Sequence, residues 1–210
     1  PVPRPYCLIQ ELPTMATDPK TIQTPLAKDY YTALHHAALT ISSSLELASV
    51  LQSIVESVTA AMQVKAAVLR LLDPASDQLS LAAFHGLSPD YLDKGPIEIS
   101  HSQIDSETLC CYPVYVSDAR TDPRFQYPAA ARNEGLVSVL SVPLEVQGKA
   151  IGVMRVYTDV ETTFSDKDVQ FLSVLASLAA LSIENARLYE NVKDSYSGVV
   201  AAFWGSYLPS

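Results

Sequence analysis

Two adjacent cysteines are the side chains whose type and spacing first suggest chemistry. Cys110 and Cys111 lie side by side in the stretch TLCCYPV, just before a proline and an apolar run. A reactive thiol needs a pKa lowered by a neighbouring cation, a helix amino end or a metal, and none stands nearby in sequence. The pair instead falls near the carboxyl end of a predicted helix, whose negative dipole disfavours a thiolate. We therefore expect inert thiols, and a thiol-based redox sensor through Cys110 and Cys111 remains an alternative.

The other common patterns of catalytic and metal-binding residues are missing from the sequence. The four histidines are His35, His36, His85 and His101, and no CxxC or HxxxH spacing accompanies them. A nucleophile-elbow GxSxG, a P-loop and a dinucleotide fingerprint are also absent. The sequence thus predicts neither a metal site nor a catalytic residue, and favours a protein that is not an enzyme.

The composition is that of a packed, acidic protein. Of the 210 residues, 48% are hydrophobic and 18% are charged, and this length suits one large domain with extensions. Asp and Glu outnumber Lys and Arg by 23 to 14, a balance that repels phosphate backbones, so no nucleic-acid partner is expected. No uninterrupted apolar run reaches the roughly 18 residues of a membrane span. With no signal peptide and no disulfide framework visible, a cytoplasmic location is predicted.

Proline and serine divide the first third of the chain. Residues 1–27 contain six prolines, each of which fixes φ and removes an amide donor, so an arm or linker is predicted there. From Lys28 to Met62, apolar residues recur at helical spacing. The triplet at 42–44 interrupts this pattern. Ser43 with Glu46 three residues later matches a capping box, so we expect a second helix to begin there.

Two β-hairpins are predicted on either side of an irregular middle segment. Val64–Leu72 and Leu79–Phe84 are β-favouring runs that predict the first hairpin. Leu136–Val146 and Lys149–Tyr157 predict the second, joined at Gln147-Gly148, where glycine supplies the positive φ of a tight turn. Within the middle segment, Gly86 to Gly135, we expect two short helices and one strand, at Ser102–Leu109, Tyr127–Glu134 and Val114–Ser117.

A long helix is predicted after Ser165. Ser165 is a plausible N-cap, and Asp166 and Asp168 lie favourably near the positive end of the helix dipole. Apolar residues then recur at steps of three and four as far as Tyr189, in a stripe wider than one sheet face needs. Part of this stripe either faces another helix or is buried in its own core. Gly198 is expected to end the helix.

These elements and their residues resemble a known family of sensory domains. The resemblance rests on Glu134-Gly135, Val142-Pro143-Leu144, Gly148, Ile151-Gly152-Val153-Met154-Arg155-Val156-Tyr157, Phe164, Asp168 and Ile183–Tyr189, with Val116-Ser117-Asp118 and Asp122-Pro123-Arg124 upstream. This combination is similar to the GAF domains of bacterial signalling proteins, over roughly residues 30 to 192.

The resemblance implies an α+β fold related to the profilin and PAS folds. Its antiparallel sheet has five or six strands, with the first, second and last helices on one face and the irregular middle as a roof over the other. Such domains hold a small molecule between roof and sheet, and loops over a rigid sheet suit a concave pocket. The resemblance also implies a homodimer through helices near 28–62 and 166–195, and an attached or partner output domain.

The ligand is not identified by the family's known motifs. Bilin-carrying members attach the pigment at a cysteine followed by histidine, whereas Cys110 and Cys111 are followed by cysteine and tyrosine. Cyclic-nucleotide-binding members carry Asn-Lys, a Phe and then Asp-Glu; Phe164 and Asp168 match, but the Asn-Lys pair is absent and Val169 replaces the acid. Both ligands are therefore disfavoured, and the cofactor is unknown. The cysteine spacing also fails to match the family's free methionine sulfoxide reductase.

Candidate ligand-binding residues lie in or beside the expected roof. Arginines there would pair with a carboxylate or phosphate, histidines would donate hydrogen bonds, and aromatic rings would form walls. Surface ion pairs, satisfied histidines and ordinary core packing are the respective alternatives. The candidates are Phe84, His85, Tyr91, His101, Tyr115, Asp118, Arg120, Arg124 and Phe125.

The sequence thus predicts a proline-rich arm or linker at 1–27, a GAF-like domain at 28–195 and a helical extension or tail at 196–210. Its expected function is non-enzymatic sensing of a small molecule, signalled through dimeric helices. A module that only dimerises or interacts, with no ligand, is the second hypothesis, and the thiol-based redox sensor is the third.

Overall fold

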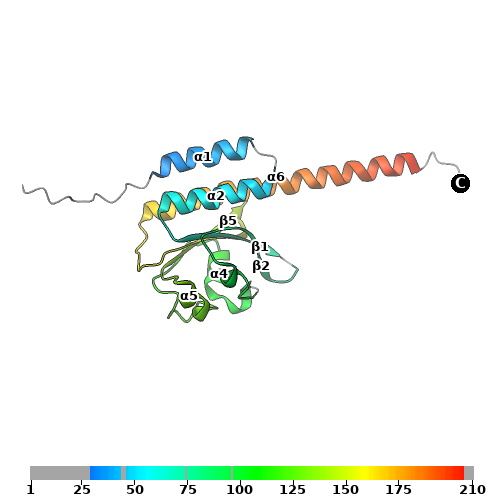
Figure 1. Ribbon diagram of the computed structural model, residues 1–210. Helices are drawn as coiled ribbons and strands as arrows, with labels where there is room; N and C mark the ends of the chain where they lie inside the picture. Colours follow the sequence, from blue (N-terminus) through cyan, green and yellow to red (C-terminus); the bar gives the residue numbers. More distant parts are fainter. Residues whose placement is uncertain (1–28, 44–45, 74, 96, 206–210) are drawn as a thin grey trace, which may run out of the picture.

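A six-stranded antiparallel sheet forms the centre of the fold (Figure 1). The computed structural model describes residues 29–43, 46–73, 75–95 and 97–205. The strands follow the order β3-β2-β1-β6-β5-β4 across the sheet. They are β1 (Ala66–Asp73), β2 (Gln78–His85), β3 (Ile97–Glu98), β4 (Val114–Val116), β5 (Val139–Val146) and β6 (Lys149–Tyr157). Both predicted hairpins are confirmed, as β1–β2 and β5–β6.

Helices cover the two faces of this sheet in different ways (Figure 1). One face carries α2 (Leu47–Met62) and the first half of α6 (Asp166–Gly205), and α1 (Tyr30–Ser43) lies outside them in contact with both. The opposite face carries the roof, built from α3 (Pro89–Leu92), the 3-10 turn η1 (Ile99–His101), α4 (Gln103–Leu109) and α5 (Pro128–Glu134). This arrangement confirms the predicted α+β fold, with helices on one face of the sheet and the roof on the other.

Alternation along the central strands divides the core into two parts. Successive side chains of a strand point to opposite faces of the sheet. In β1, Ala67 and Leu69 join the core beneath α2 and α6, while Ala66 and Val68 join the core beneath the roof. The middle parts of β1 and β6 are therefore apolar on both faces, and a polar residue there, such as Arg70 or Arg155, is buried.

Three details of the elements differ from the sequence predictions. Ser43 belongs to α1, and Glu46 is the residue that precedes α2, without a side-chain capping bond. The predicted capping box of Ser43 and Glu46 is therefore wrong, although the helix break itself is confirmed. The long helix continues past Gly198 to Gly205, since glycine inside a helix costs only about 1 kcal/mol. The elements α3, β3 and η1 were not predicted, and the segment 1–27 lies outside the described residues.

The first part of α6 is long and apolar enough to cross a membrane by length and composition alone. This part runs from Asp166 to Lys193, and 44% of its most apolar window is buried in the fold. Its buried side chains pack on the sheet face; they include Phe171, Leu172, Leu175, Ala179 and Ile183. The hydropathy of this helix is thus partly explained by its place in the core.

Candidate functional site

A small polar cavity lies between the roof and the sheet. Its walls come from β1, β6 and the roof elements, and they enclose about 10 Å³, which is room for about one water molecule. The lining residues are Arg70, Tyr91, Lys94, Ile97, Ser102, Asp105, Phe125, Gln126, Tyr127, Arg155 and Tyr157. Most of these side chains are polar, so the cavity differs from an ordinary apolar packing defect.

Two arginines enter the cavity from neighbouring strands of the sheet. Arg70 is paired with Val153, and Arg155 with Val68, across the β1–β6 ladder. Residues two apart on a strand, and residues opposite each other, share a face, so both arginines point to the roof. The two residues are only 8% and 6% exposed. Guanidinium groups remain charged in proteins, so two positive charges are buried here.

Asp105 on α4 neutralises one of these charges. A terminal nitrogen of Arg155 donates to Asp105 Oδ1, and Ser102 Oγ donates to Asp105 Oδ2 at 2.5 Å. Ser102 also caps the start of α4. Burial opposes the charge of Arg155, but Asp105, Tyr157 and Tyr91 together hold the pKa of Arg155 above its usual value. The ion pair therefore fastens the roof helix α4 to strand β6.

Three buried polar atoms around the cavity have no hydrogen-bond partner. They are Tyr91 Oη, Gln126 Oε1 and Arg155 Nε. A buried polar group left unpaired costs about 1 to 3 kcal/mol, so native proteins seldom leave several together. Burial also raises the pKa of Tyr91 well above its usual value, which keeps the phenol protonated and able to donate. The cavity thus presents unused hydrogen-bonding groups to whatever enters it.

Lys94 closes part of the cavity wall. Its ammonium lies 3.4 Å from the centre of the Tyr91 ring and donates to the Tyr91 carbonyl at 3.1 Å. Burial, and then the charges of Arg70 and Arg155, lower the pKa of Lys94 to about 7. Its charge at neutral pH therefore depends on what else occupies the cavity.

Of the nine candidate residues, two line the cavity. Tyr91 and Phe125 are both buried, and Phe125 lies beneath the Arg155 guanidinium, 5.9 Å from ring centre to guanidinium carbon. Phe84 packs at the edge of the roof core without reaching the cavity. Of the nine, only Tyr91 and Phe125 therefore lie where they could contact a ligand in this cavity.

The remaining aromatic and histidine candidates lie elsewhere on the domain. Tyr115 on β4 is 39% exposed and its hydroxyl donates to the Thr162 carbonyl. His85 is exposed, and the exposed His101 contacts Glu98 at 3.0 Å. None of these residues lines the cavity. A ligand role for them stays a prediction.

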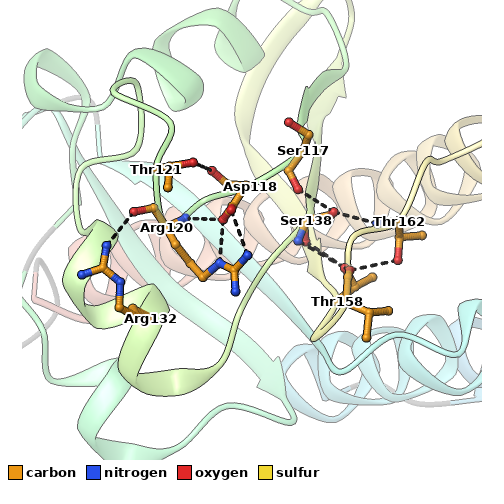
Figure 2. Close-up of polar contacts among 9 residues, drawn as sticks. Ser117, Asp118, Arg120, Thr121, Arg132, Ser138, Thr158 and Thr162 are labelled. Carbon is orange, nitrogen blue, oxygen red and sulfur yellow. Dashed lines mark hydrogen bonds and ion pairs between the residues drawn. The ribbon is translucent and has the colours of Figure 1, made fainter.

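Asp118, Arg120 and Arg124 form local ion pairs in the loop between β4 and α5. The Arg120 side chain points at Asp118 (Figure 2), with its Nε 2.8 Å from Asp118 Oδ1. Arg124 pairs with Asp122 at 2.8 Å and also with Glu107 on α4 at 3.4 Å. The side chain of Arg120 holds the pKa of Asp118 low, at about 2. Each arginine thus closes a ring onto an aspartate two residues earlier. These contacts are the surface ion pairs that the sequence analysis gave as the alternative to ligand binding. Neither guanidinium lies on the cavity wall.

Hydrogen bonds fix this loop to the sheet (Figure 2). Ser138 Oγ donates to the Ser117 carbonyl at 2.7 Å and accepts from the Thr162 amide at 2.9 Å. Arg132 on α5 donates to the Arg120 carbonyl at 3.1 Å. The polar character of the loop is therefore explained by the bonds that hold the roof in place.

The two cysteines lie at the end of α4, outside the cavity. Cys110 is exposed, Cys111 is partly exposed, and both thiols are free. Burial and the neighbouring Glu145 raise the pKa of Cys111, which lowers the fraction of reactive thiolate. In the described ranges, no group of three or more His, Cys, Asp or Glu side chains gathers in a way that could hold a metal.

Replacing Cys111 by serine is expected to leave the domain's stability and its thiol-independent properties unchanged. The labelling rate of the wild-type protein with iodoacetamide at pH 7 should not exceed that of free cysteine, because the Cys111 thiol is mostly protonated. The variants Cys110→Ser and Cys111→Ser, each made with Cys7 also replaced by serine, assign the rate to the two adjacent thiols. A rate about tenfold or more above free cysteine would revive the redox hypothesis.

Eight polar cavity residues were missed by the sequence predictions, among them Ser102, Tyr127 and Tyr157. The other five are Arg70, Lys94, Asp105, Gln126 and Arg155. The available signal was an arginine inside an apolar run of each strand, VLRLL in β1 and VMRVY in β6. Because both strands are buried on both faces, such an arginine must be buried as well.

Comparison with known proteins agrees with this fold. The model of the GAF domain family matches residues 46–183. The GAF domain of an Acinetobacter phosphoenolpyruvate-protein phosphotransferase is 25% identical with a TM-score of 0.64, covering 75% of this chain and 94% of that one. Free methionine-R-sulfoxide reductase from Neisseria meningitidis, solved with its substrate, is 21% identical with a TM-score of 0.65, covering 85% and 98%.

The chain belongs to the GAF domain family. The Nif-specific regulatory protein of Herbaspirillum seropedicae is 24% identical to it over 157 residues, which is 72% of this chain. The chain spans 28% of the length of that relative. GAF domains occur in sensory and regulatory proteins, and that relative is one of them.

Proposed function

We propose that this GAF domain is a non-enzymatic sensor that binds a small molecule in the cavity between roof and sheet. The observation that carries the proposal is the set of unpartnered buried atoms, Tyr91 Oη, Gln126 Oε1 and Arg155 Nε, around one polar cavity. A bound ligand that pairs with them removes a cost that the empty domain bears. We place this sensor in the cytoplasm, as one part of a larger signalling protein.

Strands β1 and β6 offer a route from the cavity to the helices. Arg70 and Arg155 face the cavity, whereas Leu69 and Met154, each one residue away, pack in the core beneath α2 and α6. A ligand that draws the two arginines together shifts these strands, and close packing transmits the shift to the helices.

The signal would leave through a homodimer formed by α6. Val174, Leu181 and Leu188 recur every seven residues, and Val192 follows four later, which is the spacing of a coiled-coil seam. These side chains are between 46% and 69% exposed, so a second copy of the chain would cover them. On α1, Leu39 and Tyr31 are also large apolar side chains that are exposed.

Native mass spectrometry of the purified chain tests the ligand and the dimer together. We expect a dimer whose mass exceeds that of two chains, with the excess lost on denaturation. Leu181→Glu should give monomers by placing a charge in the seam, whereas Thr163→Glu, in an exposed loop, should not. Monomeric wild-type protein at micromolar concentration would contradict the dimer. An excess that survives denaturation would contradict the non-covalent pocket.

A module without any ligand is the second candidate function. The small size of the cavity, about 10 Å³, favours it, because a single water fills that space. Absence of any mass excess in native spectra, together with an intact dimer, would support this candidate over the sensor.

A further inference from the structure

Positive charge exceeds negative charge around the cavity. Arg155 has Asp105 as its partner, but the Arg70 guanidinium donates only to the Leu79 carbonyl, at 3.5 Å. Within the ranges that the structure describes, no carboxylate oxygen lies within 4 Å of Arg70. A buried charge without a partner is costly, so this guanidinium is suited to an anion that arrives from solution.

Lys94 adds a third cation to the same wall. The charged groups that face its ammonium are Arg70 on β1, Arg155 on β6, Asp105 on α4 and Glu134 on α5. The two arginines oppose the charge of Lys94, and the two acids favour it. An additional anion beside Lys94 would therefore favour its protonated form.

We infer that the ligand of this cavity is a small oxyanion, a carboxylate or a phosphate, bound by Arg70, Arg155 and Lys94. This inference rests on the proposed function and names the chemical class of its ligand. Arg155 Nε and Tyr91 Oη, both without partners, are donors that match the acceptor oxygens of such an anion. Arginine is also the side chain best suited to pair with carboxylate and phosphate oxygens.

The anion enters past the partly exposed side chains of the lining. Lys94, Gln126 and Tyr127 are the lining residues with substantial exposure. Because the closed cavity holds about one water, an anion of several atoms must displace side chains at this opening. The Lys94 ammonium hydrogen bonds to one backbone carbonyl, so its movement breaks no ion pair.

Isothermal titration calorimetry of the whole chain with matched probes tests the inference. The probes are succinate, inorganic phosphate and the neutral analogue succinamide. We expect one bound anion per chain and no binding of succinamide. Succinate binding without phosphate binding identifies a carboxylate site, and the reverse identifies a phosphate site. Binding of succinamide as tight as that of succinate, or no binding of either anion at millimolar concentration, overturns the oxyanion.

Arg70→Met should weaken anion binding about tenfold or more, since it removes a charge-assisted pair while keeping the apolar stem. Arg120→Met is the matched control, because Arg120 pairs with Asp118 outside the cavity. The anion affinity of this control should stay within about twofold of wild type. If Arg70→Met does not fold, Lys94→Met carries the same test. Equal affinities for the cavity variants and the control overturn the inference.

Protonation of Lys94 gives a second readout. Its pKa is about 7 in the free domain, and a bound anion raises it, so binding takes up protons. Succinate affinity should therefore be highest below pH 7 and fall as the pH rises above 7, where the free Lys94 is neutral. Lys94→Met should abolish this pH dependence, whereas an unchanged pH dependence would contradict the role of Lys94. A neutral ligand found in native spectra, with no anion binding, would refute the oxyanion and leave the sensor standing.

Discussion

Replacing Asp105 by alanine is expected to destabilise the domain by about 3 to 5 kcal/mol, because it leaves the Arg155 guanidinium buried without its carboxylate. Arg155 and Asp105 are 6% and 1% exposed, so water cannot solvate the remaining charge. The ion pair also fastens α4 to the sheet, and its loss should loosen the roof. Urea unfolding followed by circular dichroism measures the change in the free energy of unfolding.

Two further variants separate the buried charge from other effects of the Asp105 substitution. The double variant Asp105→Ala, Arg155→Met removes both charges and should recover most of the lost stability. Glu190→Ala breaks the exposed pair with Lys193 and should change stability by about 0.5 kcal/mol or less. A single variant that loses less than about 1 kcal/mol would show that Arg155 is not isolated from solvent.

The Asp105 variant also bears on the ligand class. With its carboxylate gone, the cavity holds Arg70 and Arg155 without any buried acid among its lining residues. Added phosphate or succinate should then stabilise Asp105→Ala more than it stabilises the wild-type protein, by mass action on the folded state. Equal stabilisation of the two proteins would argue that the anion does not lie beside Arg155.

Most of the architecture could be predicted because it depends on local patterns. The Gln147-Gly148 turn between two apolar strands has positive φ at both residues, 50° and 78°, as its glycine indicates. Ser165 and Asp168 exchange hydrogen bonds at the start of α6, as the N-cap prediction requires. Each of these features involves residues within four positions of each other, where sequence spacing fixes geometry.

The cavity could not be predicted because its members meet only through strand register and roof placement. Arg70 and Arg155 are 85 positions apart in the chain, and they share a face because Val68 pairs with Arg155. Asp105 lies early in a predicted helix, where the helix dipole favours an acidic side chain. Its residue type therefore gave no sign of a buried partner. By contrast, Arg120 and Arg124 were predicted to bind a ligand because they lie in a polar loop. Each of them instead pairs with an aspartate two residues earlier.

The capping-box error has a similar physical origin. The spacing of Ser43 and Glu46 suits a helix start, but Glu46 itself takes the position before α2, and Ser49 Oγ donates to Glu46 Oε2 at 2.6 Å. The same two residue types thus occur at the helix start in the reverse order. Residue spacing alone did not establish which of them precedes the helix.

Replacing Gly152 by alanine is expected to destabilise the domain by about 3 kcal/mol, the upper part of the range for overpacking a core. An added Cβ at this position would collide with the backbone carbonyl oxygen of Arg70 and lie 3.0 Å from Leu144 Cδ1. Backbone atoms of a central strand cannot rotate away as a side chain can. The pairing of β1 with β6 must therefore open.

The consequence of the Gly152 substitution extends to the cavity, because the displaced carbonyl belongs to Arg70. Hydrogen exchange of the β1 and β6 amides, measured by mass spectrometry, should be faster in the Gly152→Ala variant. The affinity of the variant for an anion should be lower than that of the wild type. Gly148→Asn is the control: a Cβ there meets nothing within 4 Å, and asparagine tolerates positive φ, so the cost should be about 1 kcal/mol or less. Similar losses for both variants would show that backbone conformation, rather than close approach of the two strands, explains the glycine at 152.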